Sequence, residues 1–270
     1  MGDILESLAD HLLTLDPIGY GASTQNPFLQ KAGNGTLSKT VLQEWLAQDR
    51  LYAQAYLRFA SLLLANIPLP ATVSPNHINE RLSSLVLEAI NNIRQELKFF
   101  EDVAVRYGLN LEASVVSAGV QSYRAIFAEV GEGVEKNTHG ILEGIVLLWG
   151  TEKCYLDAWT HASTFSSPDS PPEQDADGGA LRKEFIPNWT SDAFVDFVDK
   201  CANLMEEIWT SQQSLVTWEL LERSAMRSMG AERVGRQSRR EWIEWVDVLW
   251  ERILEAETIF WPEHEDEWDN

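Results

Sequence analysis

The stretch SKTVLQEWLAQDRLYAQAYLRFASLLLANI, residues 38–67, carries the clearest structural signal in this chain of 270 residues. From Val41 to Ile67 its apolar residues recur at steps of three and four, which is the spacing of one face of an α-helix. Ser38 is a candidate N-cap residue, because its hydroxyl can accept a hydrogen bond from a free backbone N–H of the first turn. The stretch therefore predicts one long helix with a buried face.

The rest of the chain shows the same helical spacing, and no segment alternates apolar and polar residues as a strand does. The prolines of PLPATVSPNH, residues 68–77, end the first long helix because proline cannot continue the backbone hydrogen-bond ladder. Gly131 and Gly133 are expected to end a helix that begins at residue 117. Further helices are expected over about residues 79–107, 117–130, 138–164, 190–229 and 238–261.

Composition favours a single all-α domain over residues 1–270. The chain is 44% hydrophobic and has 11 Trp and 10 Phe, which is enough to form a large core without metals or disulfides. We expect about seven antiparallel helices joined by short turns. Residues 166–180, which begin SSPDSPPEQDADGG, contain prolines and acids but no large apolar side chain. We expect them to form a disordered, solvated loop.

Net charge limits the expected partners. The 21 basic and 42 acidic residues give a formal charge of −21, which would repel both a nucleic acid and an anionic membrane surface. The N-terminus has acids where a signal peptide needs bases, so a cytoplasmic protein is expected. Cys154 and Cys201 lack the spacing of a disulfide framework, and both are expected to be reduced. The oligomeric state stays open, with a homodimer as one alternative.

Polar residues with helical spacing mark a first candidate site. Trp45, Asp49, Tyr52 and Tyr56 stand three or four residues apart and share one helix face. An acid among apolar neighbours is costly unless a partner stabilises it. Asp49 is therefore either a structural acid that a Tyr hydrogen-bonds or an acid that binds a ligand.

Two further helices carry acids beside aromatic residues. Glu152, Tyr155 and Trp159 share a face in the most hydrophobic segment of the chain. Glu152 should have a raised pKa, as a general acid or base needs, unless a buried Lys or Arg pairs with it. In ILEAETIFWP, residues 253–262, Glu257 lies on the face of the aromatic pair that follows it, although a surface Glu beside such a pair is common.

Four separated segments together resemble the TenA family of aminopyrimidine-hydrolysing proteins. NPFLQKAGNGTLSKTVLQEWLAQDRLYAQAY (residues 26–56) resembles the family's N-terminal segment, and LLWGTEKCYLDAW (147–159) resembles its middle helix. FIPNWTSDAFVDFVDKCANLME (185–206) and EAETIFW (255–261) are similar to its later helices. The resemblance implies a haem-oxygenase-like multi-helical bundle that takes part in thiamin salvage.

The resemblance also assigns roles to individual residues. It implies that Asp49 and Tyr52 bind substrate, that Tyr155 and Tyr123 reach the same pocket, and that Glu257 acts on the leaving amine. Asp49 could form paired hydrogen bonds with the ring nitrogen and exocyclic amine of an aminopyrimidine. Aromatic side chains, with Trp159 among them, would stack on the faces of the ring.

One position departs from the better-known branch of the family. Thr151 stands where that branch has its nucleophilic Cys, and Glu152 follows it, so the chain resembles the branch that carries a Glu instead. Cys154 lies about 100° from the pocket face and is expected to be a core thiol. In this interpretation Glu257 delivers a proton to the leaving amine and Glu152 activates a water molecule, and neither a cofactor nor a metal is needed.

The same hydrolase could also remove an N-formyl group from this substrate class. Two alternatives to the hydrolase stay open. A catalytically inactive protein that binds pyrimidines as a carrier or regulator would also explain the aromatic pocket. Asp157 and His161, four residues apart, could begin a metal site of a di-iron oxidase, but no second inward His is evident. We therefore expect no metal.

Overall fold

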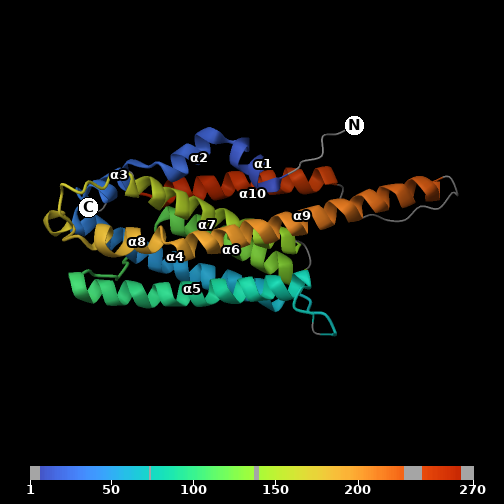
Figure 1. The fold of residues 1–270 in the computed structure, drawn as a ribbon, viewed down its shortest axis with the longest axis horizontal. Helices are drawn as coiled ribbons and strands as arrows, with labels where there is room; N and C mark the ends of the chain where they lie inside the picture. The colour runs from blue at the N-terminus through green and yellow to red at the C-terminus, as the bar shows by residue number, and fades with distance from the viewer. Residues whose placement is uncertain (1–6, 73, 137–139, 228–238, 263–270) are drawn as a thin grey trace.

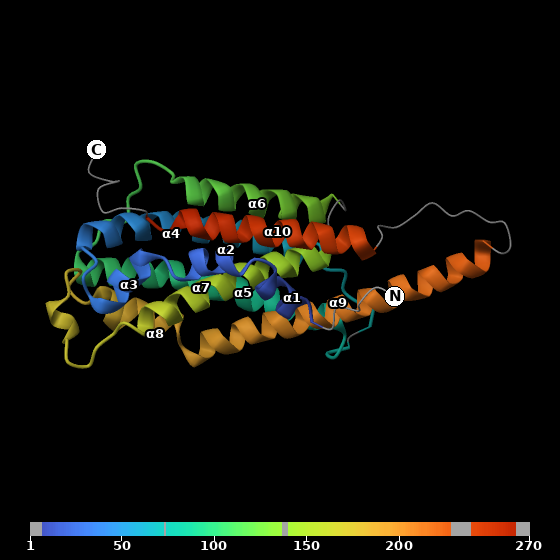
Figure 2. The same ribbon diagram turned by 90° about the horizontal axis from the view of Figure 1, so that it is seen from above.

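The computed structural model describes residues 7–72, 74–136, 140–227 and 239–262, and all regular structure in these ranges is helical. The long helices run along the long axis of the molecule (Figures 1 and 2). The α-helices are α1 (Leu8–Leu15), α2 (Pro17–Thr24), α3 (Pro27–Asn34), α4 (Lys39–Ala65), α5 (Ile78–Tyr107), α6 (Ala118–Glu135), α7 (Ile141–Ser163), α8 (Ile186–Trp189), α9 (Asp192–Arg227) and α10 (Arg239–Phe260).

The ends of the long helices follow the local sequence signals. The Ser38 hydroxyl accepts a hydrogen bond from the backbone N–H of Val41 and so caps α4, as predicted. Gly108 ends α5 with a φ of 63°, a left-handed conformation that glycine adopts without strain. Three short helices, α1 to α3, precede α4 and are additional to the helices expected from the sequence. The expected helix limits near residues 229 and 238 lie outside the described part of the chain.

The predicted end of α6 at Gly131 is wrong, since this helix continues to Glu135. A Cβ atom added at Gly131 would come within 3.1 Å of Leu62 on α4. The glycine therefore permits a close approach of α4 and α6 rather than a turn, because helix packing distance depends on the side chains at the contact.

Helix α7 is the central helix of the bundle. It packs against α2, α3, α6, α8, α9 and α10. Its residues from Leu142 to Thr151 are all buried, in agreement with their place in the most hydrophobic segment of the chain. In both views α9 runs past the end of the other helices (Figures 1 and 2). No helix in the described ranges is long and apolar enough to cross a lipid bilayer.

The segment of residues 166–180 differs from the disordered loop expected from its composition. It contains a short 3₁₀ helix, Pro172–Gln174, and leads into a π-helix, Leu181–Phe185. Asp175 accepts a hydrogen bond at 2.7 Å from Nε of Arg182, and both side chains are buried. Asp177 accepts the backbone N–H groups of Gly179 and Leu181. Polar contacts thus order Asp175 and Asp177, two of the acids that composition alone assigned to solvent.

Candidate functional site

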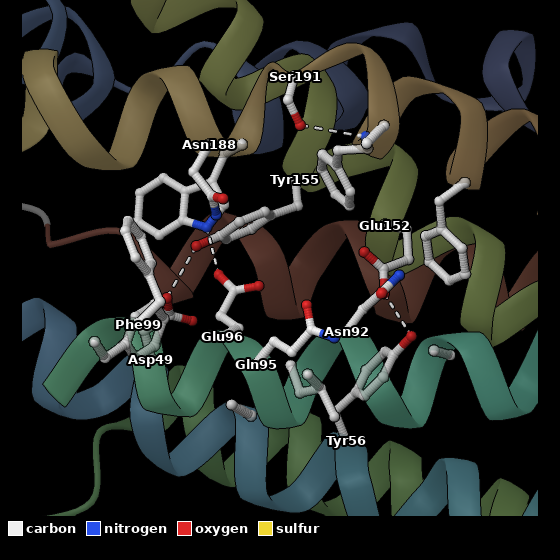
Figure 3. A pocket seen from close by; sticks show the side chains of 18 of the residues that line it. Asp49, Tyr56, Asn92, Gln95, Glu96, Phe99, Glu152, Tyr155, Asn188 and Ser191 are labelled. Atoms are coloured by element: carbon white, nitrogen blue, oxygen red, sulfur yellow. Dashed lines mark hydrogen bonds between the residues drawn. The ribbon is translucent and has the colours of Figure 1, made fainter. Parts of the chain in front are cut away.

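A cavity of about 460 Å³ lies between α4, α5, α7, α8 and the start of α9. Its walls combine aromatic side chains with carboxylates and amides, which is the composition of many small-molecule sites. Figure 3 shows several of these side chains converging on one space. The acids and aromatic residues that line it include Asp49, Tyr52, Tyr56, Glu96, Glu152, Tyr155 and Trp189.

Asp49 on α4 is one of the buried acids of this cavity, with 3% of its surface exposed. The Tyr155 hydroxyl on α7 donates a hydrogen bond to its Oδ2 at 2.9 Å (Figure 3). Burial raises the pKa of Asp49 well above its usual value, and the nearby charge of Glu96 raises it further. Asp49 therefore has the features of both interpretations: a Tyr hydrogen-bonds it, as expected of a structural acid, and it faces the cavity, as expected of a ligand-binding acid.

Glu152 faces the same cavity from α7, one helical turn before Tyr155. The Tyr56 hydroxyl donates a hydrogen bond to its Oε1 (Figure 3). No Lys or Arg in the described ranges forms an ion pair with Glu152. Burial raises its pKa to about 8. Its carboxyl can therefore exchange protons near neutral pH.

Glu96 on α5 was not recognised from the sequence. The indole N–H of Trp189 donates a hydrogen bond to Glu96 Oε1, and burial raises the pKa of this acid to about 7. Helical spacing could have found it, because Glu96 stands three residues after Ile93 and four before Phe100, and both line the cavity.

Glu257 on α10 lies outside the residues that line the cavity. It is 2% exposed, the Tyr123 hydroxyl donates to its Oε2, and its Oε1 has no hydrogen-bond partner within the described ranges. Burial raises its pKa to about 8. The ring of Tyr52, which lines the cavity, packs edge-on against Tyr123 at a centroid distance of 4.8 Å. Tyr52 therefore connects Glu257 to the cavity wall.

The predicted site residues thus form two groups. The first group lines the cavity and consists of Asp49, Tyr52, Glu152 and Tyr155. The second group lies behind the walls and consists of Tyr123, Trp159 and Glu257. Trp159 is fully buried and packs against Trp189 at a centroid distance of 4.3 Å, so it supports a wall residue instead of facing the space.

The remaining candidates from the sequence lie elsewhere. Cys154 and Cys201 are free, fully buried thiols whose pKa values burial raises, and neither lines the cavity. Asp157 pairs with Lys153 at 2.7 Å and accepts the Tyr20 hydroxyl. His161 packs against the ring of Phe165.

Comparisons with known proteins agree with this architecture. The sequence model of the TENA/THI-4/PQQC family matches residues 15–234. A Fusarium pseudograminearum protein named a probable transcription factor is 27% identical over 236 residues, a match that covers 77% of this chain and 46% of that protein. The chain therefore spans less than half the length of this relative.

Two further comparisons extend the likeness to other organisms. A Glycine max protein named a probable bifunctional TENA-E protein is 21% identical over 185 residues, which covers 68% of this chain and 72% of that protein. The crystal structure of a TenA homologue from Pyrococcus furiosus superimposes with a TM-score of 0.69 at 21% identity, covering 94% of this chain and 97% of that one. At this identity the structural match shows a shared fold.

Proposed function

Because the chain belongs to the TENA/THI-4/PQQC family, as its resemblance to TenA indicated, we propose that it hydrolyses aminopyrimidine breakdown products of thiamin. The bond cleaved joins the one-carbon substituent of the ring to its amine. The observation that carries this proposal is a single cavity in which Asp49 and Glu152, two acids with raised pKa values, lie among aromatic walls. The proposed ligand is a small molecule, and neither a nucleic acid nor a membrane is needed.

Asp49 is proposed to orient the ring. A carboxyl group can pair with a ring nitrogen and the neighbouring exocyclic amine through two hydrogen bonds. Tyr155 holds one oxygen of Asp49 at 2.9 Å, which restricts the rotation of the carboxyl group. Tyr155 and Trp189 line the same wall and can pack against the ring.

Glu152 is proposed to act on the attacking water. Its ionised form, a minority below its pKa of about 8, accepts a proton from the water as the water oxygen bonds to the substituent carbon. The carbon–nitrogen bond breaks, and its electron pair goes to the leaving amine. The amine needs a proton to leave as ammonia. This step requires no cofactor or metal. Thr151, at the position of the family's nucleophilic Cys, supports water activation over covalent catalysis and placement in the branch that carries a Glu.

Glu257 keeps its proposed role as the source of that proton, although it must act across Tyr52. With a pKa of about 8 its carboxyl holds a proton at neutral pH. Its unpartnered Oε1 leaves one oxygen free to change partners when a ligand displaces the Tyr52 ring. Glu257 can therefore contact the substrate only after the Tyr52 ring has moved out of the cavity wall.

The test is ammonia release from 4-amino-5-aminomethylpyrimidine with equimolar formation of the 5-hydroxymethyl product. Release above the rate of the Glu152→Gln variant would support the proposal. Binding of the compound without any ammonia would contradict it.

That second outcome would favour a pyrimidine-binding regulator. Two observations support this alternative: Thr151 replaces the nucleophile, and the Fusarium relative is named a probable transcription factor. An increase in melting temperature with pyrimidine, in the absence of turnover, is its expected signature.

A further inference from the structure

The cavity contains more carboxyl groups than the proposed reaction uses. Carboxylates line it at Asp49, Glu88, Glu96 and Glu152, and its described lining includes no Lys, Arg or His. Glu88 forms an ion pair with Lys200 at 2.8 Å. Among the residues that the structure describes, the other three acids receive hydrogen bonds only from neutral groups, which are the Tyr155 hydroxyl, the Trp189 indole and the Tyr56 hydroxyl. A bound cation would compensate this excess of acid.

Glu96 is the acid best placed to receive that cation. It extends from α5 into the space between Asp49 and Glu152 (Figure 3). Its charge raises the pKa of both of these acids, so it lies close to each of them. A positive group beside Glu96 would therefore stabilise the ionised forms of all three carboxylates.

The hydrogen bond from Trp189 leaves one oxygen of Glu96 available. The indole N–H is bonded to Oε1, and the Glu96 side chain stays partly accessible from the cavity. Trp189 is itself held by Trp159 and by Phe185, whose ring centroid lies 4.9 Å away. The carboxyl group is thus supported by a rigid aromatic wall, which lowers the cost of ordering it around a ligand.

We propose that Glu96 is a specificity-determining residue that binds the protonated amine of the ligand and selects it over neutral acylamine ligands. This inference rests on the proposed function and names its substrate class, a cationic aminopyrimidine. The ammonium group already carries the proton with which ammonia leaves, so Glu257 serves as the proton donor when that proton has passed to a carboxylate. An ammonium group has three N–H donors and one positive charge, which suit the free oxygen of Glu96 beside two further carboxyl groups. An acylamine would place a neutral group against Glu96 and leave the acids uncompensated.

Calorimetric titration at pH 7 with three probes tests this proposal. The probes share the 4-aminopyrimidine ring and carry a 5-aminomethyl, a 5-hydroxymethyl or a 5-formamidomethyl group, so only the first is cationic. The parent protein should bind the aminomethyl probe about tenfold or more tightly than either neutral probe. Glu96→Gln should reduce this preference to about twofold, because an amide keeps the bond to Trp189 but loses the charge.

Two variants serve as controls. Glu101→Gln removes an exposed carboxylate on the same helix that does not line the cavity, so the tenfold preference should remain. Glu96→Asp keeps the charge and should retain most of the preference. Unchanged affinity of Glu96→Gln for the hydroxymethyl probe shows that the variant is folded and that its cavity is intact.

The outcomes separate this inference from the function on which it rests. If the parent binds all three probes equally, or if Glu96→Gln keeps the full preference, Glu96 does not select for charge. The proposed function as a pyrimidine site is retained in that case. If the parent binds none of the probes, the proposed function and this inference both fail. Should Glu96→Gln not fold, a parent protein that lacks the tenfold preference still contradicts the proposal, and loss of the preference in Glu96→Asp contradicts it as well.

Discussion

Replacing Glu152 by Gln should make the protein more stable at neutral pH while lowering its activity. Glu152 has no cationic partner in the described ranges, and burial raises its pKa from 4.5 to about 8. Below about pH 4.5 the acid is protonated in both the folded and unfolded states and affects stability equally. As pH rises from there, only the unfolded chain loses the proton, so folded stability falls until the pH passes about 8.

The magnitude follows from the pKa difference. Each pH unit between the two pKa values costs about 1.4 kcal/mol of unfolding free energy. Between pH 5.5 and 7.5 the upper limit is therefore about 2.7 kcal/mol. Partial exposure of Glu152 through the cavity reduces this value, so we expect about 1 to 2 kcal/mol. A Gln side chain does not titrate and can still accept the Tyr56 hydroxyl.

Urea unfolding of the parent and of Glu152→Gln at several pH values measures this effect. The difference in unfolding free energy should move in favour of the variant as pH rises from 5.5 to 7.5. Glu88→Gln is the matched control, because this partly exposed acid is paired with Lys200 and its replacement should give a curve parallel to that of the parent. If the unfolding free energies of Glu152→Gln and of the parent change in parallel with pH, or if the variant is less stable at every pH, the prediction is refuted. Either result would mean that Glu152 is not a buried acid without a counter-charge.

Three further predictions concern the site. Asp49→Asn should weaken pyrimidine affinity as well as turnover, whereas Glu257→Gln should lower kcat with nearly unchanged product affinity. Calorimetry measures the affinities, and an equal loss of affinity in both variants would contradict these separate roles. Cys154→Ala and Cys201→Ala should keep turnover and lose about 1 to 3 kcal/mol of stability in urea, so a folded but inactive Cys154→Ala would restore a covalent mechanism. Ammonia release should survive dialysis against EDTA, and loss of activity that added iron restores would instead indicate a metal enzyme.

The fold class could be read from the sequence because it depends on local spacing. Steps of three and four between apolar residues specify a helix with a buried face regardless of what covers that face. The predicted long helix from Ser38 and the predicted end of the next helix near residue 107 are confirmed for this reason. The all-α bundle and the membership of the TenA family are confirmed as well. The continuation of α6 through Gly131 was missed, since the need for close packing against α4 is not a local property.

Only the tertiary structure decided which acids share a space. Spacing along one helix placed Asp49 and Glu152 on buried faces, but it could not show that Glu96 from α5 would lie between them. Nor could it show that Glu257 would lie behind Tyr52, outside the cavity lining. Helical periodicity determines the face of a residue within its own helix. The rotation and crossing of neighbouring helices, set by packing between side chains far apart in sequence, determine which faces meet and therefore which carboxylates act on one ligand.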